Sequence, residues 1–237
     1  MKKANLKLAT LNLHGFTDWE ERLPLIVDLI KKIDPDILLL QEVQQDLSRD
    51  KDDQATMIKN AAGYPHAHFE VACIKTTHKG SPLPNPIDHG LGIISKLPFK
   101  AEAISLAQAG GGLEHRILLK GVFETSGGTV TIADAHFAND DVWAAAHLKE
   151  ALEIFSSKGI ETVLAGDFNI KDLGAYRKLY EKRYIASSDK YDYVSYPEDG
   201  LSYDYMLIPN TYSFIGFQCR EEAVSDHKLL FAEIEWE

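Results

Sequence analysis

The chain has 237 residues, of which 45% are hydrophobic and 26% are charged, and its formal net charge is −11 at pH 7. This composition is typical of a globular protein and excludes an intrinsically disordered chain. No apolar run approaches the ~18 residues that a membrane-spanning helix needs, so we expect no membrane partner. No linker or repeat divides the chain, so we expect one domain over residues 1–237.

Charge and cysteine usage narrow the class of partner and the compartment. The 25 Lys and Arg residues face 36 Asp and Glu residues, and no three basic residues are consecutive. Tight, non-specific binding of long duplex DNA needs clustered cations, so this pattern argues against it. Asn5 and Lys7 interrupt the apolar segment that an export signal would need. Cys73 and Cys219 have no CxxC spacing, which favours reduced thiols in a cytoplasmic protein.

Apolar patterning predicts short strands and helices that alternate along the chain. In chain order the predicted elements are strand Asn5–Leu11, helix Pro24–Ile33, strand Ile37–Gln41, helix Leu47–Ala62, strands His68–Lys75 and Gly90–Lys96, strands Ile117–Glu124 and Thr129–Ala135, helix Asp141–Ser157, strand Glu161–Ala165, helix Asp172–Tyr184, and strands Tyr203–Ile208, Ser213–Gln218 and Lys228–Trp236. Strand–helix alternation early and hairpins later predict an α/β (α+β) sandwich in which helices cover the sheets.

The segment Thr76–His89 contains three prolines between two predicted strands. It is too long for a simple connection, so we expect a recognition loop there. Four basic or titratable residues flank it and could supply local positive potential: Lys75, His78, Lys79 and Lys96.

Polar residues follow several apolar strands at the point where each strand ends. Glu42 follows the run Leu38–Gln41, and it is either a solvated strand end or a ligand. Asp167 and Asn169 lie two residues apart, so on extended backbone they face the same way, although both residue types also favour a turn. Asp226 and His227 precede the last strand, where they either cap it or take part in a site.

Three further residues extend this pattern. Asn12 ends the first predicted strand, and His136 directly follows the strand that ends at Ala135. Asp204 lies between two tyrosines in an apolar strand, where burying an unpaired charge is costly. Carboxylate and amide oxygens without thiolates favour a hard divalent cation such as Mg²⁺ or Mn²⁺, and two histidines can transfer protons near neutral pH. This combination suits metal-assisted hydrolysis of a phosphate ester.

Several short segments match a known family in the family's own order. They are Thr10–Gly15, Leu40–Val43, Gly90–Lys96, Arg116, Ala135–Phe137, Gly166–Asn169, Tyr203–Tyr205 and Ser225–His227. With these segments the chain resembles the endonuclease/exonuclease/phosphatase superfamily, which includes DNase I. The resemblance implies a DNase I-like, four-layer α/β sandwich with two central mixed β-sheets flanked by helices and a site at one edge of the sheet pair.

The resemblance also implies a role for each candidate residue. Glu42 would be the principal ligand of Mg²⁺ or Mn²⁺, assisted by Asn12 and Asp226. Asp167 and Asn169 would orient and activate the attacking water, and Asn169 would also contact the phosphate.

The remaining implied roles concern the two histidines and their partners. His227 would be the imidazole beside the phosphate, with Asp204 as its orienting carboxylate. His136 would either donate to the phosphoryl oxygens or protonate the leaving group. Arg116 is a candidate phosphate clamp, because a guanidinium pairs bidentately with phosphoryl oxygens; the alternative is a surface arginine.

Eight other residues are left open or assigned no role. His89 either adds an imidazole to the site or caps a loop, and Asp134 either adds negative charge near the metal or points into the other layer. Six histidines have no metal-ligand spacing and are interpreted as surface or loop residues: His14, His66, His68, His78, His115 and His147.

These observations predict a monomeric, cytoplasmic, Mg²⁺- or Mn²⁺-dependent phosphoesterase, either a phosphodiesterase or nuclease, or a phosphatase. The net charge of −11 favours a small phosphate ester or a short single strand over long duplex DNA as the substrate. One alternative is a module that binds a phosphate ligand on the same fold after its site has decayed. Another is a secreted, sphingomyelinase-like phospholipase, which the absence of an export signal disfavours.

Overall fold

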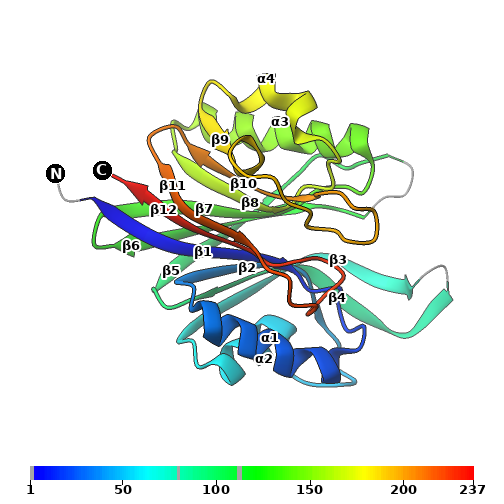
Figure 1. Cartoon of the computed structure of the whole chain (residues 1–237). Coiled ribbons are helices and arrows are strands. Elements are labelled where there is room, and N and C mark those ends of the chain that lie inside the picture. The colour runs from blue at the N-terminus through cyan, green and yellow to red at the C-terminus, as the bar shows by residue number, and fades with distance from the viewer. Residues whose placement is uncertain (1–2, 79–80, 111–113) are drawn as a thin grey trace.

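The computed structural model describes residues 3–78, 81–110 and 114–237, and within them it contains two six-stranded sheets (Figure 1). The first sheet has the order β11 (Ser213–Cys219), β12 (Leu230–Trp236), β1 (Ala4–Asn12), β2 (Ile37–Gln45), β4 (Ser81–Ser95), β3 (His66–His78). The second has the order β5 (Phe99–Ser105), β6 (Ile117–Thr125), β7 (Gly128–His136), β8 (Thr162–Asp167), β10 (Asp204–Pro209), β9 (Tyr184–Ala186). Both sheets are mixed, because β1 is parallel to β2 and β7 is parallel to β8 while their other pairs are antiparallel.

Helices cover the outer face of each sheet, so the predicted four-layer sandwich is confirmed (Figure 1). The first sheet is covered by α1 (Trp19–Ile33) and α2 (Gln54–Ala62). The second is covered by α3 (Asp141–Ser157), α4 (Arg177–Tyr180) and the 3₁₀ turn Leu173–Tyr176. Among the described residues, no helix is both long and apolar enough to cross a lipid bilayer.

The central strands are apolar at nearly every position because they are buried on both faces. In β2, Ile37 and Leu39 pack between the sheets, while Leu38 and Leu40 pack against α1 and α2. The same alternation places Val163 and Leu164 of β8 in two different cores. Since successive side chains of a strand point to opposite faces, this run of apolar residues fixes the position of each strand between two layers.

Two predicted helices differ from the observed ones. The first begins at Trp19, five residues before the predicted start, and Pro24 lies inside it. The second begins only at Gln54, because Asp53 caps it by accepting a hydrogen bond from the backbone N–H of Thr56. The preceding residues form turns instead.

Two further differences concern strands. The predicted helix Asp172–Tyr184 is wrong: the chain there forms a short 3₁₀ turn and the single helical turn α4, and Tyr184–Ala186 pairs with β10 as a strand. Pairing with a neighbouring strand outweighs the local helical pattern. Strand β5 was not predicted; it lies at the edge of the second sheet and is only half-buried.

The predicted recognition loop Thr76–His89 is also corrected, because most of it forms a hairpin. Strands β3 and β4 stay paired as far as His78 and Ser81, and the ribbon projects from the sheet (Figure 1). Pairing of β4 with β2 ends at Asp88, so beyond that residue one side of β4 has no strand beside it. Prolines at alternate positions are compatible with such a free side, because they lack the N–H that would point there. Lys79, at the tip, lies outside the described residues.

Candidate active site

Three neighbouring strands of the second sheet place polar residues side by side. His136 at the end of β7 is the register partner of Asp167 in β8, and Asp167 is the partner of Asp204 in β10. All three side chains are buried. Gly166 allows this close approach, because a Cβ at that position would lie 2.1 Å from the carbonyl oxygen of Ala135. The glycine also has φ +136°, which L-residues rarely adopt.

The first sheet contributes a second group of residues. Asn12 ends β1, and Glu42 lies at a bulge in β2 where the backbone has φ 54°. Asp226 and His227 lie in the turn before β12. Because β12, β1 and β2 are neighbours in the sheet, these residues come together at one edge, facing the group on the second sheet.

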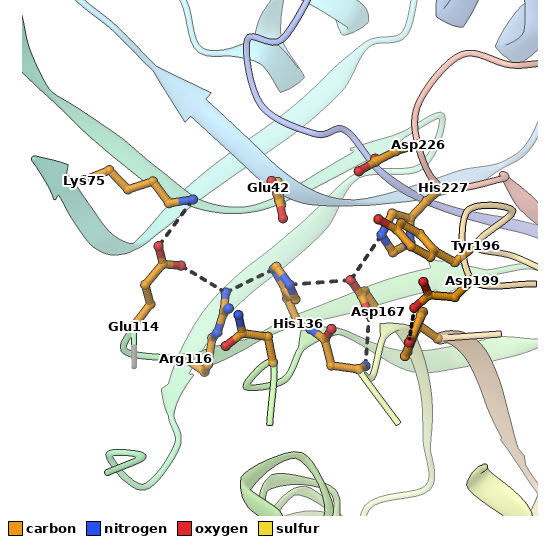
Figure 2. Close-up of a pocket in the computed structure, with 13 residues that line it drawn as sticks. Glu42, Lys75, Glu114, Arg116, His136, Asp167, Tyr196, Asp199, Asp226 and His227 are labelled. Carbon is orange, nitrogen blue, oxygen red and sulfur yellow. Dashed lines mark hydrogen bonds and ion pairs between the residues drawn. The ribbon is translucent and has the colours of Figure 1, made fainter. Parts of the chain in front are cut away.

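A cleft of about 540 Å³ opens where the two groups meet (Figure 2). Its lining contains seven of the predicted site residues, namely Glu42, Arg116, His136, Asp167, Asn169, Asp226 and His227. The other two, Asn12 and Asp204, are buried behind this lining and contact it by hydrogen bonds. The structure therefore brings all of the predicted site residues together.

The hydrogen bonds of His136 define which of its ring nitrogens carries the proton. Arg116 donates from Nη1 to His136 Nδ1 at 3.1 Å, so Nδ1 is an acceptor and the proton lies on Nε2. Burial lowers the pKa of His136 well below its usual value, and the Arg116 charge lowers it further. A neutral His136 thus presents an N–H towards Asp167 Oδ2, 3.5 Å away, and the cleft.

His227 lies between two carboxylates. Its Nδ1 is 2.9 Å from Asp204 Oδ2, and its Nε2 is 3.8 Å from Asp167 Oδ2. Ser195 donates to the same Asp204 oxygen at 2.6 Å and so holds that carboxylate in place. Burial alone would lower the pKa of His227, but the charges of Asp204 and Asp167 together raise it to about 10. His227 is therefore protonated at neutral pH and presents an N–H to the cleft.

Asp167 lies at the centre of the site and accepts hydrogen bonds on both oxygens. Asn12 Nδ2 donates to Oδ2 at 3.0 Å, and the backbone N–H of Asn169 donates to Oδ1 at 2.9 Å. Burial raises the pKa of Asp167, against the opposing charge of His227. Asn169 Nδ2 donates to the carbonyl of Phe137, which orients the Asn169 amide.

Backbone strain gathers at this site. Five non-glycine residues of the described chain have a left-handed backbone, and three of them, His14, Glu42 and Asn169, belong to the site or adjoin it. Strained conformations of this kind cost of order 1–3 kcal/mol each and persist where the surrounding structure enforces them, often at functional sites.

Two sets of side chains could hold a cation. Ligand atoms of Asp167, Asp204 and His227 lie within 4.8 Å of one another, although the two N–H groups of protonated His227 already face these carboxylates, Nδ1–H towards Asp204 and Nε2–H towards Asp167. Glu42 and Asp226 face the cleft, and Glu42 accepts only a long contact of 3.5 Å from Asn12 Nδ2 among the described residues. Asn12 Oδ1 accepts from the backbone N–H of His14, so Asn12 turns its nitrogen, not its oxygen, to the carboxylates.

The sequence alone does not decide the roles of His89 and Asp134, and both residues are buried. Asp134 lies between the sheets, beneath the site, and accepts a hydrogen bond from Gln41; burial raises the pKa of its carboxyl well above the usual value. His89 is buried beside Glu114.

The surface interpretation of His147 is wrong. Its ring is buried, lies 2.9 Å from the carbonyl of Ala107 and accepts a hydrogen bond from the N–H of Ala138.

Sequence reasoning missed several residues that shape the cleft. Four of them line it, namely Glu114, Asn139, Tyr196 and Asp199, and Tyr203, which was named only within a family segment and given no role, lines it as well. Tyr196 packs against His227 with a ring-centroid distance of 4.8 Å, and its hydroxyl donates to Glu198. These residues lie in irregular segments, where no periodic pattern indicates which way a side chain points. One signal in the sequence concerned this segment: Asp204 lies in an apolar strand and therefore needs a polar partner. Ser195, next to Tyr196 in the chain, is that partner and donates a hydrogen bond to it.

Comparison with known proteins decides the family. The model of the endonuclease/exonuclease/phosphatase family matches residues 9–227. The chain belongs to this family. No curated protein sequence matches it.

Several solved structures share the fold at low sequence identity. An endonuclease/exonuclease/phosphatase from Beutenbergia cavernae has a TM-score of 0.79 and 19% identity, covering 98% of this chain and 72% of its own. Sphingomyelinase C from Streptomyces griseocarneus has a TM-score of 0.68 and 18% identity, covering 97% and 99%. ANGEL2, a 2′,3′-cyclic phosphatase, has a TM-score of 0.67 and 15% identity, covering 98% and 95%. At these identities the likeness concerns the fold.

Proposed function

We propose that this chain is a divalent-metal-dependent hydrolase of phosphate esters. The observation that supports this most strongly is the arrangement of His136 and His227, which both direct an N–H towards Asp167 on the floor of a polar cleft. Solved structures with this fold include a 2′,3′-cyclic phosphatase and a sphingomyelinase C.

The donor set in the cleft fits a hard divalent cation such as Mg²⁺ or Mn²⁺. Glu42 and Asp226 supply carboxylate oxygens that face the cleft, and no thiol lines it among the described residues. We assign the cation to Glu42 and Asp226, with Asn12 orienting Glu42 and Asp167 from behind. When bound there, a cation would polarise a phosphoryl oxygen and offset the charge that develops in the transition state.

Protein side chains carry the remaining chemistry. Asp167 accepts a proton from the attacking water, and its raised pKa makes it a stronger base than an ordinary aspartate. Its orientation is held by Asn12 and by the backbone of Asn169. Neutral His136 donates from Nε2 to a phosphoryl oxygen, and Arg116 stabilises the same charge. Protonated His227 donates from Nε2 and is available to protonate the leaving oxygen.

The size and charge of the cleft favour small substrates. A volume of about 540 Å³ holds a ligand of the size of a small phosphate ester. The chain carries a net charge of −11, so a long polyanion would meet repulsion outside the few cations of the cleft. We therefore propose a small phosphate ester or a short single strand, not long duplex DNA, as the substrate.

Hydrolysis of p-nitrophenyl phosphate and bis-p-nitrophenyl phosphate tests the proposal. We expect turnover with Mg²⁺ or Mn²⁺, loss of turnover with EDTA, and near-complete loss in Glu42→Gln. Glu70→Gln is the matched control, because it removes the same charge from a half-exposed residue of β3 outside the cleft. Turnover that EDTA does not affect, or that Glu42→Gln retains, would contradict the proposal. Binding of phosphate esters without hydrolysis of any would favour the binding-module alternative.

A further inference from the structure

A cluster of donors lies at the end of the cleft away from Tyr196, beyond Arg116 (Figure 2). The carboxylate of Glu114 lies 3.3 Å from Lys75 Nζ, 3.5 Å from Arg116 Nη1 and 3.8 Å from His89 Nε2. Strong charge-assisted hydrogen bonds are shorter, at about 2.7–2.9 Å. Glu114 therefore lies among three donors without making a close hydrogen bond to any of them.

The hydrogen bonds of His89 show that it is a donor into this cluster. Gln44 Oε1 accepts from the backbone N–H of Phe16, so Gln44 Nε2 is the atom that faces His89 Nδ1, at 3.4 Å. His89 Nδ1 is then the acceptor and Nε2 carries the proton. Burial, together with the charges of Lys75 and Arg116, lowers the pKa of His89 to about 2, so the ring stays neutral with this tautomer.

Two buried donors of this cluster have no hydrogen-bond partner among the described residues. They are His89 Nε2 and Arg116 Nε. Both residues are more than nine-tenths buried, and an unpaired buried donor is rare because it costs free energy. The two oxygens of one carboxylate do not satisfy the three side chains around it. A phosphate group has three oxygens available to them and more negative charge, so it fits the cluster better than Glu114 does.

At the opposite end of the cleft, beside Tyr196 and Tyr203, carboxylates accept hydrogen bonds from the two tyrosines. Tyr203 donates its hydroxyl to Asp199, and Tyr196 donates to Glu198. These carboxylates would repel an anionic group that approached from this side. Among the described residues that line the cleft, the one lysine and the one arginine, Lys75 and Arg116, both lie at the Glu114 end, whereas His227 lies beside Tyr196 and is already assigned to the scissile ester. A substrate with two anionic groups is therefore oriented with its second group towards Lys75.

We propose that Lys75, His89 and Arg116 form a second phosphate subsite, which Glu114 occupies until substrate arrives. A substrate that carries a second phosphate group beside the scissile ester displaces the Glu114 carboxylate and satisfies the unpaired donors. The subsite thus selects bisphosphorylated small molecules over monophosphates. This inference rests on the proposed function for the identity of the scissile group, whereas the subsite itself is tested by binding.

Calorimetric titration with phosphonates tests the subsite without turnover, because their C–P bonds are not hydrolysed. The probes are methylphosphonate and a series of alkane-α,ω-bisphosphonates of increasing length, in buffer with Mg²⁺. The key variant is Glu114→Gln, and its matched control is Glu102→Gln, which removes the same charge from a residue paired with Lys120 outside the cleft. Lys75→Met has Lys120→Met as its control.

We expect Glu114→Gln to tighten binding of the best bisphosphonate about tenfold, or about 1.4 kcal/mol. Methylphosphonate affinity should change less than twofold, and Glu102→Gln should change neither. Lys75→Met should reduce bisphosphonate affinity to that of methylphosphonate, whereas Lys120→Met should not.

Three outcomes would overturn the subsite. Glu114→Gln could behave like Glu102→Gln, it could tighten both probes equally, or wild-type protein could bind neither probe. Equal tightening would mean that Glu114 only obstructs the scissile phosphate. Failure of the proposed function has a separate signature: the bisphosphonate preference remains and depends on Glu114 and Lys75, while no phosphate ester is hydrolysed with any metal.

Discussion

The carboxylates that the two sheets bring to the site differ in how firmly they are held. On the second sheet, His136, Asp167 and Asp204 are buried and linked to partners by hydrogen bonds. On the first sheet, Glu42 and Asp226 are partly exposed, and their contacts are long or lie outside the cleft. The difference indicates that groups for proton transfer are fixed in advance, while oxygen ligands for a cation are left open.

His136, Asp167 and Asp204 lie side by side on β7, β8 and β10 and form what we call the buried row. Replacing His227 should have the largest effect on turnover, because among the described residues it alone bridges both carboxylates of this row. We expect His227→Asn to lower kcat by about 10³-fold, within the range for loss of a general acid or base. Steady-state kinetics with p-nitrophenyl phosphate measures this, and circular dichroism checks that the fold remains. His68→Asn, on the exposed pair with Glu70, should leave kcat unchanged. A His227→Asn variant with more than a tenth of wild-type kcat would contradict the role.

Asp204 should act through His227, because it contacts the imidazole and not the cleft. Asp204→Asn keeps an oxygen for Nδ1–H but removes the charge that raises the pKa of His227. We expect kcat to fall about 10²-fold with little change in KM. The NMR titration of His227 in the absence of metal should show its pKa lowered. An unchanged His227 titration would show that Asp204 has only a packing role.

Gly166 tests whether the buried row depends on the close approach of β8 to β7. A Cβ there would lie 2.1 Å from a backbone oxygen, and φ is +136°. We expect Gly166→Ala to lower the free energy of unfolding by roughly 2–4 kcal/mol, as for other strongly strained substitutions. Gly159 is the control: it also has a positive φ, +63°, but a Cβ there meets nothing within 4 Å. Gly159→Ala should cost about 1 kcal/mol, so equal costs in urea denaturation would contradict the steric explanation.

Much of the buried row could be predicted from the sequence. Asp167 and His136 follow apolar strands, and the register of parallel strands β7 and β8 brings such ends together. The ordered family segments predicted that Glu42 and Asp226 also belong to the site. These residues are predictable because strand polarity and sheet order determine where a strand end lies.

The walls of the cleft could not be predicted in this way. Glu114 and Tyr196 lie in irregular segments, so their positions depend on tertiary packing and not on a period. Lys75 was noted only as a flanking cation, because the prolines after it suggested a loop where the chain forms a hairpin. The prolines of β4 show that this segment lacks backbone N–H donors at those positions. They do not show that its other side is paired with β3.

His147 gives the smallest expected effect and concerns stability outside the cleft. Burial lowers the pKa of His147 below its unfolded value of about 6.5, so the unfolded state binds a proton that the folded state does not. Stability is therefore lost as the pH falls below about 6.5 towards the lower folded-state pKa. Since glutamine can replace both hydrogen bonds, His147→Gln should lose less stability than wild type between pH 7 and pH 5 in urea denaturation. Parallel losses would mean that His147 already binds a proton when folded.

Binding of Mn²⁺ measured by electron paramagnetic resonance tests the division between the two sheets most directly. We expect Glu42→Gln to weaken Mn²⁺ binding strongly, by at least about tenfold, because it removes an open carboxylate ligand. Asp204→Asn should change Mn²⁺ affinity less than twofold, because Asp204 is occupied by His227 and Ser195. The opposite result, with Mn²⁺ lost in Asp204→Asn and retained in Glu42→Gln, would place the cation in the buried row and contradict the account.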